Sequence, residues 1–387
     1  MKFRKIIALT LVLVLSALLA SGCQNTRSTT SGAKDEKPKV TLWTTGSDNL
    51  RVLFETAISA YNERKDSTST VELQFIMSGS GDQKLSSRIA AAKLAGEKNT
   101  DFDLLAENGS SLAAYVEEAG ENFFVKLDFN KIPNYKNLKM KSGFYTEYVV
   151  PYRGTTVVMA YDSARLPNPP KTWDELIKWI KANPGRFAYN SPGSGGAGGA
   201  FVNLALYKGL PEEAKLSSDK KWTEQWGPGW EALKEIHPFL YKSGGKVVYP
   251  NKNQGTLDLL INKEVDLIPA WADQVLTNLA QDVLPDTVKI YQLEPALSGT
   301  DVVFAVPNIG GKAEDTYDFI NFMISPEGQK ICLETIYAVP VIDASLIDSD
   351  VKHMVADLDV SSFSVISNGS LGDVRNEYWD ANIATLP

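Results

Sequence analysis

Two loops rich in glycine and serine are the strongest candidates for a ligand site in this sequence. They span residues 78–81 (SGSG) and 191–199 (SPGSGGAGG), and each precedes a helix-like stretch. A helix that starts in such a loop turns unpaired N–H groups and its dipole towards a ligand's oxygen atoms. Neither loop fits a dinucleotide fingerprint or a Walker loop, and a turn that merely needs glycine is the alternative. The candidate contacts are Ser78, Gly79, Ser80, Gly81, Ser194, Gly195 and Gly196.

Aromatic and charged side chains form a second group of candidates. Trp271 follows the strand-like VDLIPA and precedes Asp273. An indole stacks on a ring, a sugar face or a cation, and a carboxylate pairs with an amine or a hydroxyl. Arg153 can hold a carboxylate or phosphate bidentately. Core packing is the alternative for the tryptophan, and an internal salt bridge is the alternative for the arginine. The remaining candidates are Trp43, Thr45, Glu107, Asn108 and Tyr152.

Residues for enzymatic catalysis are scarce. Nucleophilic catalysis needs a base beside Ser or Cys, and the two histidines, His237 and His353, are isolated and far apart. The chain has no G-x-S-x-G elbow, and its histidines lack metal-ligand spacing. The sequence therefore predicts a binding protein rather than an enzyme, without a metal or a cofactor. A hydrolase with paired carboxylates in a cleft is the alternative.

Alternating strand-like and helix-like segments must position these residues. Residues 40–43, 71–77 and 102–106 read as strands, followed by the loops TTGSD, SGSG and ENGSS and by helical patterns. This rhythm predicts α/β architecture with mostly parallel central sheets, in which ligands bind beyond the carboxyl ends of the strands. A second run of the same kind begins after Pro151, which predicts two lobes.

The N-terminal residues predict export. A basic start, an apolar run and small residues precede Cys23, which is the order of a secretory signal peptide. The small residues before the cysteine resemble a lipobox, so residues 1–22 are expected to be removed and Cys23 to carry a lipid. Residues 23–38 read as a polar tether.

The formal net charge of −8 disfavours nucleic acid as a partner. Cys332, the second of two cysteines, is predicted to be a buried core residue.

Two long stretches resemble type II extracellular solute-binding proteins of ABC importers. They are VVPYRGTTVVMAYDSARLPNPPKTWDELIKWIKANPGRFAYNSPGSGG and SGTDVVFAVPNIGGKAEDTYDFINFMISPEGQKICLETIYAVPV. The segment PGRFAYNSP is similar to a YnjB-type branch near thiamine, polyamine and iron binders. The resemblance implies hinges near residues 152–155 and 296–301. It also implies one lobe from 39–152 plus about 300–338, and a second from 156–296 plus about 345–387.

The resemblance also implies a function. A monomeric, lipid-anchored receptor on the extracytoplasmic side would pass a solute to an ABC permease and its ATPase. Polyamine-binding relatives line their cleft with aromatic residues, and iron-binding relatives use adjacent tyrosines. The loop TTGSD has no aromatic residue and the chain has no Tyr-Tyr pair, so the resemblance disfavours both ligands. A small polar organic solute, anionic, zwitterionic or thiamine-like, is expected instead. A surface sensor and a structural lipoprotein are the alternatives.

Overall fold

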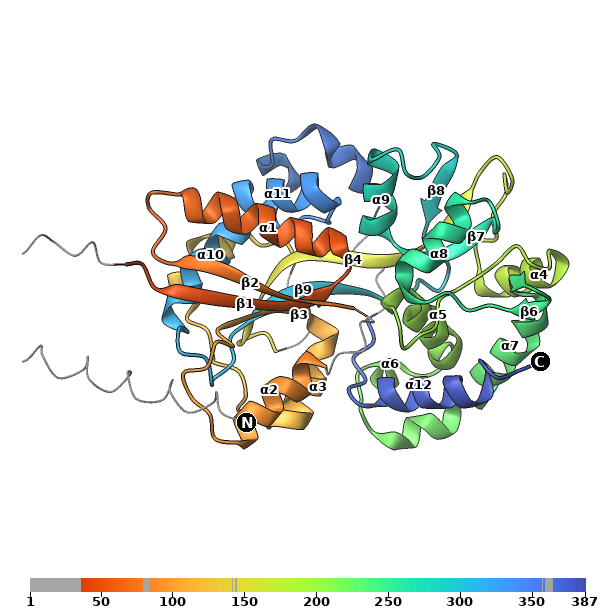
Figure 1. The fold of residues 1–387 in the computed structure, drawn as a ribbon, viewed down its shortest axis with the longest axis horizontal. Helices are drawn as coiled ribbons and strands as arrows, with labels where there is room; N and C mark the ends of the chain where they lie inside the picture. The colour runs from red at the N-terminus through yellow and green to blue at the C-terminus, as the bar shows by residue number, and fades with distance from the viewer. Residues whose placement is uncertain (1–35, 79–83, 141, 143–144, 357, 359–364) are drawn as a thin grey trace, which may run out of the picture. The chain divides into compact units, whose positions relative to one another are not determined.

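A mixed β-sheet with helices on both faces forms the centre of the folded body (Figure 1). The computed structural model describes residues 36–78, 84–140, 142, 145–356, 358 and 365–387. The main sheet has the strand order β2-β1-β3-β9-β4-β7, and β8 pairs with β4. The strands are β1 Lys39–Gly46, β2 Thr70–Met77, β3 Leu104–Asn108, β4 Val149–Asp162, β7 Leu267–Trp271, β8 Val288–Tyr291 and β9 Gly299–Ala305, with a separate β5–β6 hairpin at Lys242–Ser243 and Lys246–Val247.

Twelve α-helices accompany these strands in the described part of the chain. They are α1 Asp48–Glu63, α2 Leu85–Leu94, α3 Leu112–Ala119, α4 Trp173–Ala182, α5 Gly196–Tyr207, α6 Glu212–Lys215, α7 Gly227–Ile236, α8 Lys252–Ile261, α9 Ala272–Ala280, α10 Tyr317–Met323, α11 Pro326–Ile336 and α12 Leu371–Asn382. None of the helices in the described residues is long and apolar enough to cross a membrane.

The first half of the sheet is built by the expected strand–helix alternation. Strands β2 and β3 run parallel to β1 on either side of it, because helices α1 and α2 carry the chain back between them. Side chains alternate between the two faces of β1. Val40 and Leu42 pack with α1, α10 and α11, whereas Trp43 packs with α2 and α3 on the opposite face. Figure 1 shows these two helical layers above and below β1–β3.

Strand β4 runs through both halves of the sheet. Its residues 149–156 pair with β9, and residues 157–162 pair with β7 and β8. All these pairings are antiparallel, as is the pairing of β3 with β9. The expected α/β fold is present, but the expectation of mostly parallel sheets needs correction. Among the strands of the described residues, parallel ladders join only β1, β2 and β3, and isolated parallel bridges such as Phe187–Leu267 lie outside them.

The second half has its own buried core around β4, β7 and β8. Helices α4, α5, α7 and α12 cover one face, where Phe187, Phe201 and Trp230 are buried, and α8 and α9 cover the other. Helix α4 starts as its sequence predicts, with a capping box between Thr172 and Glu175. These layers hold the N-termini of α5, α8 and α9 beside the middle of β4.

Cys332 lies inside α11, facing the core of the first half. Its side chain is 2% exposed, as the sequence predicted for a core residue. Burial raises the pKa of its thiol to about 12, so it stays protonated and unreactive at neutral pH.

Candidate functional site

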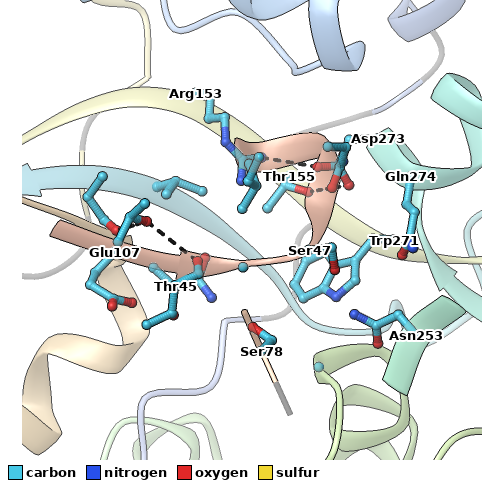
Figure 2. Close-up of a pocket in the computed structure, with 18 of the residues that line it drawn as sticks. Thr45, Ser47, Ser78, Glu107, Arg153, Thr155, Asn253, Trp271, Asp273 and Gln274 are labelled. Carbon is cyan, nitrogen blue, oxygen red and sulfur yellow. Dashed lines mark hydrogen bonds and ion pairs between the residues drawn. The ribbon is translucent and has the colours of Figure 1, made fainter. Parts of the chain in front are cut away.

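A pocket of about 130 Å³ opens where the two halves of the sheet meet (Figure 2). The loops that follow β1 and β2 supply Ser47 and Ser78 to its wall, and the last residue of β3 supplies Asn108. Strand β4 supplies the floor, and the first turns of α5, α8 and α9 close the other side. Strand ends and helix N-termini therefore converge here, as expected for a binding site in an α/β sheet. The pocket is smaller than the roughly 300–1,000 Å³ typical of drug-sized ligands.

A β-bulge in β4 places the charged residues of the floor. Pro151 pairs with Val303 and Arg153 pairs with Val302, so Tyr152 has no partner of its own on β9. The carbonyl of Tyr152 instead accepts a hydrogen bond of 2.7 Å from Nε2 of Gln329. The bulge sends the ring of Tyr152 into the core and leaves the next residue, Arg153, at the pocket.

Arg153 and Asp273 form a buried ion pair in that floor. Nη1 of Arg153 lies 3.4 Å from Oδ2 of Asp273, and their side chains are 3% and 8% exposed. The hydroxyl of Thr155 donates to Oδ1 of Asp273 at 3.4 Å. Burial raises the pKa of the Asp273 carboxyl, and the Arg153 charge opposes that rise. Within the described residues, Nε of Arg153 is buried without a hydrogen-bond partner. Arg153 thus keeps one buried N–H available for a further hydrogen bond.

Glu107 supplies a second carboxylate on the opposite side of the pocket. It is the penultimate residue of β3, and the hydroxyl of Tyr115 donates to its Oε1 at 3.0 Å. Burial raises the pKa of Glu107 to about 7, although bonds from Tyr115, the Asn108 N–H and Thr45 favour the ionised form. The side chain therefore exchanges a proton near neutral pH, and it can either donate or accept a hydrogen bond.

Trp271 and the start of α5 form the third side. The indole packs so closely on Gly196 that a Cβ there would lie 2.9 Å from Cζ2 of Trp271. Asn253, in the first turn of α8, accepts a hydrogen bond of 3.1 Å from the N–H of Ala197. Glycine at position 196 thus lets an aromatic face and a helix N-terminus share one wall.

The structure brings most of the residues proposed from the sequence to this pocket. Those that line it are Thr45, Ser78, Glu107, Asn108, Tyr152, Arg153, Gly196, Trp271 and Asp273. Gly79, Ser80, Gly81 and Cys23 lie outside the described residues.

Three candidates lie elsewhere. The indole of Trp43 faces α2 and α3 and donates to the carbonyl of Asp101 at 2.9 Å, because its strand position points it away from the pocket. The hydroxyl of Ser194 donates to the carbonyl of Ser191 and accepts from the N–H of Lys252, so it holds its own loop. Gly195 is the N-cap of α5 and does not line the pocket.

Six polar residues that line the pocket were missed from the sequence, namely Thr44, Ser47, Asn49, Thr155, Asn253 and Gln274. Thr155 lies two residues after Arg153, and Gln274 directly follows Asp273. Their closeness along the chain to these predicted residues was the signal that could have identified them. Ser47 and Asn253 lie at helix starts, where such residues also serve as caps. A capping role and a ligand role have the same sequence pattern.

Comparisons with known proteins show matches across most of the chain. The family model described as bacterial extracellular solute-binding protein matches residues 56–356. Protein YnjB of Escherichia coli K12 is 25% identical over 262 residues, covering 62% of this chain and 64% of that relative. The match therefore spans less than two thirds of the relative's length.

Solved structures share the fold at low sequence identity. An ABC transporter structure from Clostridium perfringens has a TM-score of 0.61 and 17% identity, covering 89% of this chain and 98% of that one. A periplasmic thiamin-binding protein has a TM-score of 0.62 and 15% identity, covering 90% of this chain and 96% of that one. These similarities establish a periplasmic-binding-protein fold.

Proposed function

Because the chain belongs to the bacterial extracellular solute-binding protein family, as its sequence predicted, we propose that it captures a small polar solute outside the cytoplasm and delivers it to an ABC permease. The pocket between the halves of the sheet carries this proposal. The loops after β1 and β2, the end of β3 and the first turns of α5, α8 and α9 converge there around Arg153, Asp273 and Glu107. That combination of buried charges and helix N-termini suits a ligand with several polar groups.

The two cores support a division into lobes. One core draws mainly on residues 40–152 and 302–355, and the other on 157–297 and 371–383. We propose β4 and β9 as the hinge strands, because each core ends where these strands pass from one half of the sheet to the other. Ile347 and Val355 pack in the first core. We therefore propose that the chain returns to the second lobe after Val355. This is later than residue 345, near which the sequence analysis expected the return.

Closure of these lobes would be the signal that the permease reads. A few backbone dihedrals of β4 and β9 can absorb the motion while both cores stay rigid. A solute that touches Glu107 in one lobe and Trp271 in the other stabilises the closed state. Lipid attachment at Cys23 would hold this receptor at the membrane.

The test is a ligand screen on the chain without residues 1–22 and with Cys23→Ser. The protein is refolded once to remove any retained solute and melted with thiamine compounds, amino acids, phosphonates, sugars, polyamines and ferric chelates. A solute at about 100 times its Kd stabilises the native state by roughly 2.7 kcal/mol.

Solution scattering on the same protein then tests closure. A solute that raises the melting temperature is expected to lower the radius of gyration. Binding without compaction refutes the hinged receptor, and turnover of the bound compound refutes the assignment as a binding protein.

A further inference from the structure

A second cavity of about 210 Å³ lies behind the shared wall of the pocket. Asn108, Gly196 and Trp271 line both cavities, so the indole and the start of α5 lie between two adjacent spaces. The second space continues between α5 and the C-terminal helix α12, where it reaches Arg375. Its volume is many times the 10–15 Å³ that one water needs, so it has room for a group of several atoms.

Arg375 is a buried cation that forms no ion pair with any of the described residues, although the nearby Asp373 charge favours its charged form. It is 9% exposed, and burial lowers the pKa of its guanidinium to about 10. Its hydrogen bonds go to neutral oxygens. Nη1 donates to Oδ1 of Asn203 at 2.8 Å and to the carbonyl of Gly199 at 3.3 Å, while Nε and Nη2 donate to Oδ1 of Asn376. A buried charge is costly unless an opposite charge compensates it.

The cavity also contains an unsatisfied hydroxyl. Oγ of Ser298 is buried and has no hydrogen-bond partner in the described part of the chain. It immediately precedes β9, the proposed second hinge strand. A buried hydroxyl without a partner is unfavourable, and a ligand oxygen in the cavity would satisfy it.

The guanidinium of Arg375 lies against the start of α5. A Cβ at Gly199 would lie 3.4 Å from both Nη1 and Nη2 of Arg375, which is van der Waals contact. The cation therefore sits against the first turn of a twelve-residue helix, whose dipole repels it. An anion in the cavity, beside the guanidinium and the first turn of α5, would offset that repulsion and be attracted by both.

We propose that this second cavity binds the anionic end of the transported solute, a carboxylate, phosphonate or phosphate, through Arg375 and Ser298. The uncharged or cationic polar end of the same molecule then lies in the first pocket, between Glu107 and Trp271. This inference rests on the proposed function, since it describes one part of the same solute site. It narrows the solute class to small organic anions and zwitterions with a second polar end.

The test compares small anions with uncharged and cationic molecules of the same size. Phosphate, methylphosphonate and propionate, with propanol and propylamine as counterparts, are titrated at constant ionic strength by calorimetry and thermal melting. The variants are Arg375→Gln, Arg375→Lys and Ser298→Ala, each in the chain with Cys23→Ser and without residues 1–22. Lys178→Gln is the matched control, because it removes an exposed cation from α4 away from both cavities.

The expected result is anion binding by the wild type that weakens at least about tenfold in Arg375→Gln, as for a charge-assisted hydrogen bond. Ser298→Ala is expected to weaken it about fivefold without loss of stability, since its hydroxyl has no protein partner to lose. Arg375→Lys should recover part of the affinity, and Lys178→Gln should bind as the wild type does. A purely structural arginine would instead lower the melting temperature and leave the discrimination between propionate and propanol unchanged.

A second readout separates this inference from the function on which it rests. Mass spectrometry identifies any organic solute that each protein carries when purified natively and then denatured. If the wild type and Arg375→Gln bind the same solute equally, the anion site is refuted and the receptor function stands. If the wild type carries no solute and responds to none in the wider screen, the receptor function is refuted. If the wild type binds solutes but none of the three anions, the anion site alone is refuted.

Discussion

Replacing Glu107 with glutamine should make the free energy of unfolding depend less on pH. Burial raises the pKa of this carboxyl from 4.5 to about 7 in the folded state. At roughly 1.4 kcal/mol per pH unit, the shift corresponds to about 3 kcal/mol. Glutamine has nearly the same shape, keeps an oxygen to accept from Tyr115, and carries no charge at any pH.

The sign follows from proton binding. Between pH 4.5 and 7 the folded state holds a proton on Glu107 that the unfolded state has lost, so the free energy of unfolding falls as pH rises. The stabilising contribution is complete below about pH 4.5 and is lost as pH rises through 7. Other buried carboxyls titrate as well, so the informative quantity is the difference between Glu107→Gln and the wild type.

Urea unfolding at half-unit steps from pH 4.5 to 8.5 measures that difference. We expect Glu107→Gln to gain about 3 kcal/mol relative to the wild type across this range, with most of the gain before pH 7.5. The exposed Glu224→Gln, on the protein surface, is the matched control and should show no such gain. A difference that stays constant with pH would mean that Glu107 is ionised throughout, and the reasoning from its burial would be refuted.

Three further substitutions test the framework around the site. Gly198→Ala places a Cβ 1.9 Å from the carbonyl oxygen of Asn190, so we expect it to lower the free energy of unfolding by roughly 3 kcal/mol, measured by urea unfolding; a neutral result would mean that α5 shifts freely. Arg153→Met leaves the Asp273 carboxylate buried without its cation and should lower the free energy of unfolding by about 3–5 kcal/mol. In a double-mutant cycle, Asp273→Asn in the same chain should restore most of this loss. Additive losses would contradict the ion pair. Gln329→Leu removes the partners of three backbone groups, so we expect the free energy of unfolding to fall by about 3 kcal/mol or more, which lowers the urea midpoint. An unchanged midpoint would show that the bulge needs no such support.

The first strands and helices were predictable because their signals are local. The apolar spacing of Leu53, Phe54, Ala57 and Tyr61 indicated the helix that the structure shows as α1. The strand expected at residues 71–77 is β2, Thr70–Met77. Each of these elements needs only its own pattern and a nearby turn, so the sequence carries enough information to place it.

Strand direction in the middle of the sheet could not be predicted in this way. Strand β9 pairs with β3 and β4, and its partners lie about 150 to 200 residues earlier in the chain. Nothing in the sequence of β9 states which neighbours it will meet or in which direction. The local rhythm therefore suggested mostly parallel strands, whereas β4 and β9 pair antiparallel with their neighbours.

Some pocket residues could be predicted from local sequence patterns, whereas the positions of others depend on distant parts of the chain. Loops after parallel strands were expected at one edge, and Ser78, Glu107 and Asn108 do meet there. The bulge that aims Arg153 depends on Gln329, which is distant in sequence, so it had no local signal. Trp43 was misplaced because the alternation along β1 gives two faces without saying which one is the ligand's.

The buried thiol of Cys332 makes this protein a convenient scaffold for a fluorescent sensor. With Cys23 absent, Cys332 is the only cysteine in the chain, and its thiol pKa of about 12 and 2% exposure protect it from maleimide reagents. A cysteine introduced at the pocket rim, for example Ser78→Cys, would then be the single labelled position. A dye attached there would report solute capture directly, without any need to remove the native thiol.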